Sequence, residues 1–161
     1  MPRIITPELV ARAIELVRPA VQEILCDSQA VWGPRWVDGW VDAPGLEKAY
    51  RFGFQAMRSR SRVWNRKWGK KMDFVSVADK KLSVVKRLGV NTSAVAKLMP
   101  WLLQEGEYLY AGGAWRDGIC VAVSGAKSAA DEAIAEMVAS AIVMLCLLDA
   151  EKRLKENKAQ I

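Results

Sequence analysis

The residues best equipped for chemistry form a basic, tryptophan-rich run from position 58 to 71, here called the Arg/Trp run, which holds seven basic residues and no acid. Arg62, Trp64, Arg66 and Trp68 alternate with other residues in it, so in a strand they would share one face. The four-residue spacing within each type also fits one face of a helix. Guanidinium groups pair with carboxylates and phosphates, and indole rings stack on flat or cationic groups. The run is therefore suited to holding an anionic, planar molecule.

Three interpretations of the Arg/Trp run remain open. It can be a solvated basic edge, because charged runs usually lie in water and basic edge strands block unwanted pairing. It can form one wall of a small-molecule pocket. It can also bind single-stranded nucleic acid, although no nucleic-acid module signature accompanies it. The excess of basic over acidic residues, 24 against 18, favours an anionic partner without choosing among these.

A second group of candidate ligand contacts lies nearer the C-terminus, where a Gly-Gly pair and a Ser-Gly loop flank a predicted hairpin. Gly112 and Gly113 lack a side chain, so a ligand or another backbone can approach them closely. Ser124, Gly125 and Lys127 precede a long predicted helix, and the free amides at a helix start favour a carboxylate or phosphate. The other interpretation is that the glycines serve turn geometry and that polar residues merely cap the helix.

Catalysis has few candidates in this sequence. Asp117, Asp131 and Glu132 are acids that can act as a base, and Lys127 can stabilise developing negative charge. The chain has no histidine, which removes the commonest general base at neutral pH and the commonest metal ligand. Its three cysteines are scattered, without the paired spacing of a zinc site. The sequence therefore predicts no metal site and no defined reaction, and each acid has an alternative role in a turn, a cap or the surface.

The segment from 111 to 136 is similar to the most recognisable motif of the GlcG-like family, also called the haem-degrading-domain or HbpS-like family. That motif combines a Gly-Gly pair, a strand, an Asp-Gly turn, a second strand ending in Val-Ser-Gly, and an Asp-Glu pair that opens the last helix. The matching residues here are Gly112-Gly113, Asp117-Gly118, Val123-Ser124-Gly125 and Asp131-Glu132. The segment 78–95 and the opening helix also resemble the family, whereas residues 28–71 diverge and look like an insertion.

This resemblance implies a single domain over residues 1–161 with a small-ligand pocket, and an assembly of several copies. It also implies haem or a related tetrapyrrole as a ligand of some members. Because the chain has no histidine, ordinary haem ligation is disfavoured, and tyrosine, cysteine, methionine or a weak oxygen ligand would have to replace it. The sequence therefore leaves the cofactor undefined.

The helices and strands that must position the Arg/Trp run can be predicted from the spacing of apolar residues and from helix-capping residues. Thr6 and Pro7 begin a helix that Pro19 should kink or break. The tryptophan- and valine-rich residues 28–43 favour short strands joined by a turn. Residues 44–57 favour a weak helix because large apolar side chains recur on one side of it.

The second half of the chain gives clearer patterns. A helical stripe begins after Asp73 and ends at Gly89. Residues 108–124 form a hairpin about an Asp-Gly turn. Ser128 and Asp131 form a capping box that opens a long helix whose central turns are apolar all round. The apolar run of this helix is too short to span a membrane, so the helix packs inside the protein or against another subunit.

Together these patterns predict an α+β fold, with one domain, an antiparallel sheet of about five strands flanked by the N- and C-terminal helices, and a polar helical tail over residues 151–161. The favoured function is binding of a small anionic or planar molecule between the Gly-Gly strand, the Ser-Gly loop and the Arg/Trp run. The alternatives are an enzyme acting on a small organic acid and a single-stranded nucleic-acid binder. No apolar signal segment opens the chain, so we predict a cytoplasmic homo-oligomer with no membrane partner.

Overall fold

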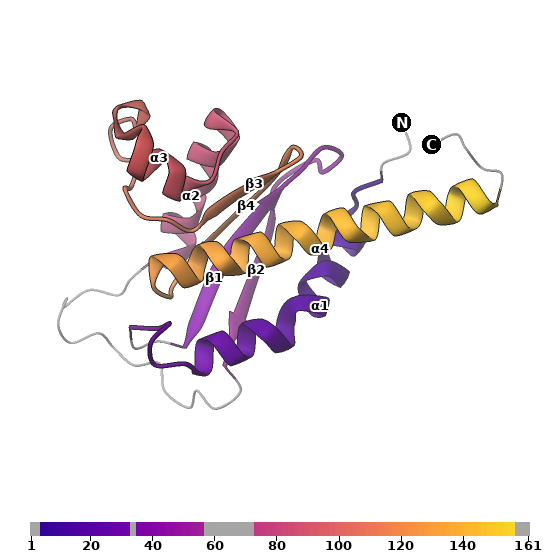
Figure 1. The fold of residues 1–161 in the computed structure, drawn as a ribbon, viewed down its shortest axis with the longest axis horizontal. Helices are drawn as coiled ribbons and strands as arrows, with labels where there is room; N and C mark the ends of the chain where they lie inside the picture. The colour runs from indigo at the N-terminus through magenta and orange to yellow at the C-terminus, as the bar shows by residue number, and fades with distance from the viewer. Residues whose placement is uncertain (1–3, 33–34, 57–72, 157–161) are drawn as a thin grey trace.

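The computed structural model describes residues 4–32, 35–56 and 73–156, and its fold is α+β, as predicted (Figure 1). In chain order the elements are α1 (Pro7–Cys26), β1 (Trp36–Asp42), β2 (Tyr50–Gln55), α2 (Phe74–Leu88), α3 (Thr92–Leu98), a single 3-10 turn η1 (Pro100–Leu102), β3 (Gly113–Arg116), β4 (Ile119–Ser124) and α4 (Ser128–Lys155). The N-terminal and C-terminal helices pack against each other and against the sheet.

The sheet of the described residues is antiparallel and has four strands in the order β2-β1-β4-β3, where about five were predicted. Two differences account for the smaller number. Residues 28–43 supply one strand, β1, instead of two short ones. The predicted hairpin over residues 108–124 also begins later than expected. Its first strand, β3, starts at Gly113, so residues 108–112 are not part of it. The Asp117-Gly118 turn of that hairpin is confirmed.

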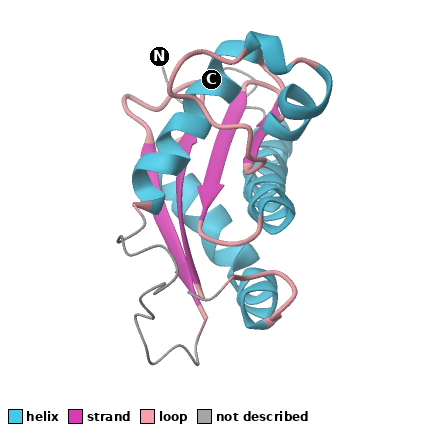
Figure 2. Cartoon of the chain, turned by 90° about the vertical axis from the view of Figure 1, so that its left-hand side faces the viewer, coloured by secondary structure: helices cyan, strands magenta, loops and turns pink. Residues whose placement is uncertain are grey.

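Helices cover both faces of the sheet (Figures 1 and 2). α1 and α4 pack on one face, and α2 packs on the other against β1, β3 and β4. Successive side chains of β4 point to opposite faces of the sheet. Val121 and Val123 belong to the larger core with α1 and α4. Cys120 and Ala122 instead belong to a smaller core with Leu82 of α2. β4 is therefore a central strand, buried along its whole length.

The first hairpin corrects two predictions made for residues 28–57. Gly39 lies in the middle of β1 and not in a turn, because the Phe52 ring occupies the place of its side chain, 2.3 Å from an added Cβ. The predicted weak helix over 44–57 is wrong, since Tyr50–Gln55 is strand β2. Phe52 and Phe54 point into the core while their neighbours are exposed, which is the two-residue period of a strand.

The helix starts and ends are mostly those that the sequence indicates. The Thr6 hydroxyl caps α1 by accepting from the Leu9 amide, and the helix continues through Pro19 without ending. The Asp73 carboxylate caps α2 by accepting from the Ser76 amide. α2 then ends at a glycine in the left-handed conformation, which only glycine adopts readily.

The capping box predicted for α4 is wrong. The residue at the N-cap is Lys127, with no side-chain hydrogen bond to the helix, and Ser128 is already the first helical residue. The Asp131 side chain is buried and bonds outside its own helix. Among the described residues α4 is also the one helix long and apolar enough to span a membrane, with 39% of its most apolar stretch buried. A core helix passes the same test, and α4 packs on α1, β3 and β4.

Candidate functional site

A buried ion pair joins the two helical layers at one end of the sheet. Lys81 comes from α2 and Asp131 from the start of α4, and each side chain is only 3% exposed. The Lys81 ammonium donates to Asp131 Oδ2 at 3.1 Å and to the Val123 carbonyl at 2.9 Å. The other carboxylate oxygen, Oδ1, accepts from the Ala126 amide at 2.9 Å. The Asp131 carboxylate therefore binds the Ala126 amide just before α4, where we expected an anionic ligand to bind.

Burial controls the protonation of this pair. It raises the pKa of Asp131 to about 6 from an ordinary 3.8, although Lys81 and the amides of Ala126 and Gly125 act in the opposite direction. Burial also lowers the pKa of Lys81, against the attraction of Asp131. Both charged forms are thus costly away from water, and each depends on the other to stay ionised. The pair ties α2 to α4 and has little contact with solvent.

We expect Asp131 to titrate near pH 6 in the folded protein. The folded state then holds this proton more tightly than the unfolded chain does. Its contribution to stability is complete below pH 3.8 and is lost as the pH rises through 6. Carbon-detected NMR of the side-chain carboxyl measures the midpoint, with Asp131→Asn to assign the signal. A midpoint at or below 3.8 would show that burial does not control this group.

The Gly-Gly pair makes room for protein side chains. A Cβ added to Gly112 would lie 2.5 Å from Lys81 Nζ, inside the ion pair. A Cβ added to Gly113 would lie 2.4 Å from Val85 and 2.8 Å from the Thr92 methyl carbon. The space that these glycines leave, where we expected a ligand to approach, is therefore filled by α2 and α3.

The Ser-Gly loop is held in the same way, except at its last residue. Ser124 is buried at the end of β4. Gly125 has φ 137°, and a Cβ there would meet the Trp36 carbonyl at 2.5 Å. Lys127 differs, since its ammonium lies over the exposed Trp32 ring, 5.1 Å from the ring centre. Of the three predicted ligand contacts in this loop, Ser124, Gly125 and Lys127, only Lys127 contacts an exposed side chain, that of Trp32.

Side chains of Glu132 and Asn91 hold the first turn of α3 between β3 and α4, a structural role that sequence reasoning missed. The Glu132 carboxylate accepts from both the amide and the hydroxyl of Ser93, and so caps α3 from another helix. Asn91 donates to Glu136 and accepts from the Trp115 amide at 2.9 Å. Glu132 thus has protein partners for both of its oxygens, in a role that is structural in this geometry.

The structure separates Asp117 from the other candidate acids. Asp117 lies in the turn between β3 and β4, with φ 51°, and Gly118 follows with φ 85°. This turn is at one end of the hairpin, whereas Gly112 and the Ser-Gly loop lie at the other end. Asp131 and Glu132 lie at the start of α4, near that other end. Asp117 therefore cannot share a site with them.

The Arg/Trp run itself lies outside the described residues. This applies to its four predicted ligand contacts, Arg62, Trp64, Arg66 and Trp68. The residues that flank the run are described, however. The Ala56 amide donates to the Arg35 carbonyl at 2.9 Å, and the Phe74 ring contacts the Trp36 ring edge-on at 6.1 Å. Both flanks therefore lie at the start of β1, which is also the end of the sheet that carries Gly125.

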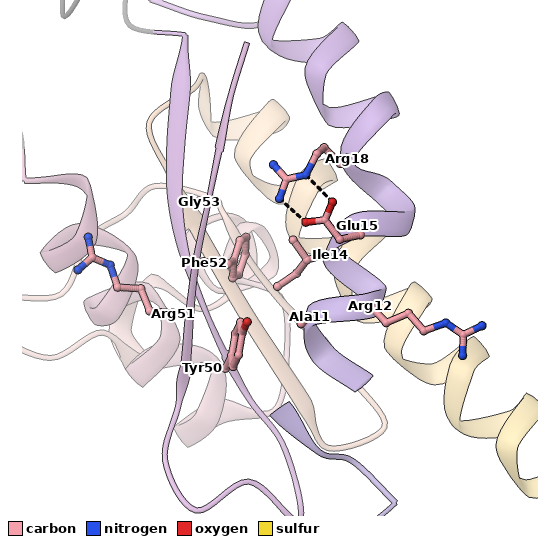
Figure 3. Close-up of a pocket in the computed structure, with 9 residues that line it drawn as sticks. All are labelled: Ala11, Arg12, Ile14, Glu15, Arg18, Tyr50, Arg51, Phe52 and Gly53. Carbon is pink, nitrogen blue, oxygen red and sulfur yellow. Dashed lines mark hydrogen bonds and ion pairs between the residues drawn. The ribbon is translucent and has the colours of Figure 1, made fainter. Parts of the chain in front are cut away.

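A separate hollow of about 330 Å³ lies between α1 and β2 (Figure 3). Arg18 and Glu15 bond to each other on α1, at 2.9 and 2.6 Å. Arg12 and Arg51 point away from the hollow in opposite directions (Figure 3). Its basic residues do not converge on one point, so this hollow is not arranged to hold an anion.

Two further observations bear on identity. Within residues 4–32, 35–56 and 73–156 no group of three histidine, cysteine, aspartate or glutamate side chains could hold a metal ion. No protein-family model matches the sequence, and no curated protein matches it. The resemblance to the GlcG-like family therefore rests on the motif residues and stays a prediction.

Lys81 is the important residue that the sequence analysis overlooked. It lies three residues after Ala78 and four before Val85, and both of these are fully buried on α2. A lysine on the apolar stripe of a helix predicts a buried ammonium that needs an acid. That signal was available in the sequence, whereas the identity of its partner was not.

Proposed function

We propose that the chain is a binding protein for a small anionic, planar molecule, held at the end of the sheet where β4 leads into α4. The observation that supports this most is the exposed pair formed by Trp32 and Lys127. The Trp32 side chain is 75% exposed, and the Lys127 ammonium lies 5.1 Å from its ring centre. An exposed indole beside a cation can stack on a flat molecule and pair with its acid group.

The position of the Arg/Trp run relative to this pair adds support. The residues on either side of the run, Ala56 and Phe74, both contact the start of β1. The Lys127 amide donates to the Ala30 carbonyl at 2.9 Å, which places Trp32 and Lys127 near the same end. The described residues that flank the run thus lie near the same end of the molecule as Trp32 and Lys127. The basic and aromatic residue types of the run would suit an anionic ligand there.

Binding is favoured over turnover because two of the three candidate acids, Asp131 and Glu132, already bond to other protein groups. Asp131 is held by Lys81 and the Ala126 amide, and Glu132 is held by Ser93. Neither acid has a free, solvent-facing carboxylate that can take a proton from a substrate. An enzyme acting on a small organic acid remains the alternative, and it would need catalytic groups outside this network.

We expect Trp32→Ala to weaken binding of a flat aromatic dicarboxylate about tenfold, because stacking and cation–π contacts contribute about 1–2 kcal/mol. Trp101→Ala is the matched control, since Trp101 is also 75% exposed but belongs to η1. Fluorescence titration of the two variants measures the difference. Equal affinities would remove the Trp32–Lys127 pair from the binding site.

Native mass spectrometry and an absorbance spectrum of the purified protein identify the ligand class. A bound small molecule would support the proposal, and a Soret band would name haem despite the missing histidine. Binding of an oligonucleotide that weakens steeply with salt, with no small molecule bound, would favour the nucleic-acid alternative instead.

A further inference from the structure

The outward side of α4 carries a regular repeat that the fold uses only in its first half, where Met137 packs at the edge of the core and Ser140 accepts from Arg116. Its members alternate at spacings of four and three residues, and we call them the outer seam: Ala133, Met137, Ser140, Met144, Leu147, Glu151 and Leu154. This is the heptad spacing with which one α-helix packs along another. The residues that α4 buries in its own core, such as Ile134, Val138 and Ile142, form a different stripe.

The outer seam is exposed where its side chains are largest. Met144 is 45% exposed, Leu147 61% and Leu154 64%, and the neighbouring Leu148 is 51% exposed. The last buried residue of α4 is Leu145. The remaining turns project past the sheet (Figure 1). A row of large apolar side chains in water on a projecting helix marks an interaction surface.

The chemistry of this surface fits a second copy of the chain better than a lipid. Beside the seam, the last turns of α4 carry charges of both signs: Asp149, Lys152, Arg153 and Lys155. Charges of both signs complement the same pattern on an identical helix, whereas a lipid interior would have to desolvate them. The seam also runs along most of a 28-residue helix, about 40 Å long, which offers a long contact.

We propose that two copies of the chain associate by packing their α4 helices together along the outer seam. Such a contact is isologous, with the same patch used on both copies, which is the commonest symmetry of soluble oligomers. Glu151 is the charged member of the seam, and its carboxylate weakens the contact because pairing removes it from water. The dimer forms independently of any ligand at the other end of α4.

Sedimentation velocity of the full chain across a micromolar concentration range tests this proposal. Wild type should sediment as a dimer. Leu147→Glu should raise the dissociation constant at least about tenfold, by placing a charge on each side of the seam. Glu151→Leu should lower it, because the carboxylate is removed from the seam. Leu98→Glu is the matched control, since Leu98 is 68% exposed but lies on α3.

All three substituted positions are exposed, so each variant should fold, and circular dichroism of each variant checks this. A monomeric wild type at high micromolar concentration would overturn the proposal. Equal weakening by Leu147→Glu and Leu98→Glu would also overturn it, because the contact would then be unspecific. A wild type that remains monomeric but co-sediments with phosphatidylglycerol vesicles would assign the seam to a membrane surface instead.

Discussion

Replacing Lys81 by methionine should lower the free energy of unfolding by about 3–5 kcal/mol at pH 7. The change leaves the Asp131 carboxylate, on a side chain that is 3% exposed, without its counter-ion in the interior. The Ala126 and Gly125 amides still interact with the carboxylate, but they do not neutralise its charge. Urea denaturation followed by circular dichroism measures the loss.

The effect should depend on pH in a defined direction. Lys81 lowers the pKa of Asp131, so its removal should raise that pKa beyond about 6. The carboxyl of the variant would then be protonated at pH 5 and cost less to bury. The deficit of Lys81→Met should therefore shrink as the pH falls from 7 to 5. A deficit that stays constant over this range would argue that Asp131 is not the group left unpaired.

Two further variants isolate the ion pair. The double change Lys81→Met with Asp131→Leu removes both charges and should recover most of the lost stability, because a buried pair can often be replaced by apolar side chains. Lys86→Met is the matched single change, since Lys86 pairs with Asp42 but is half exposed. It should cost no more than about 1 kcal/mol. Equal losses for Lys81→Met and Lys86→Met would contradict a structural role for the buried pair.

The ion pair explains why the motif near the C-terminus has its residue types. α2 and α4 lie on opposite faces of the sheet, so their side chains can meet only past the ends of the strands or around the edge strand β3. Lys81 is long enough to pass Gly112 and reach Asp131 at that edge. The Gly-Gly pair and the aspartate at the start of the last helix thus form one packing unit. A sequence motif of this kind can therefore mark a structural joint, as well as a ligand site.

The parts of the fold that were predictable from the sequence are those set by local chemistry. Thr6 and Asp73 cap their helices because a side-chain oxygen can reach an amide three residues ahead. The Asp117-Gly118 turn follows because these residues adopt positive φ. Each of these needs only neighbours in the chain.

The parts that were not predictable depend on contacts between distant residues. A turn was predicted within residues 28–43, but Gly39 continues strand β1 because the Phe52 ring of the adjacent strand occupies the space beside it. Asp131 looked like a cap, but Lys81, fifty residues earlier, draws its side chain into the interior. For the candidate site, only Lys127 could be identified as a surface group, because its contact with Trp32 is exposed. Tertiary packing overrides a local pattern wherever it supplies a better partner.

Gly112→Ala should lower the free energy of unfolding by about 3 kcal/mol or more. Two costs add at this position. The backbone has φ 135°, which a residue with a side chain rarely adopts. The added Cβ would also lie 2.5 Å from Lys81 Nζ and 2.6 Å from the Val123 carbonyl oxygen, so the ion pair would have to shift.

Gly106→Ala separates the two costs of Gly112→Ala. Gly106 also has a positive φ, 84°, but nothing lies within 4 Å of an added Cβ. Its loss should be about 1–2 kcal/mol, from backbone strain alone. The excess loss at Gly112 then includes the crowding of the ion pair, and it should shrink in a background that carries Lys81→Met and Asp131→Leu. Part of it should persist, because the Val123 carbonyl oxygen still lies 2.6 Å from the added Cβ. If Gly112→Ala and Gly106→Ala cost the same, the space at Gly112 is not needed by Lys81, and the glycine would serve backbone geometry only.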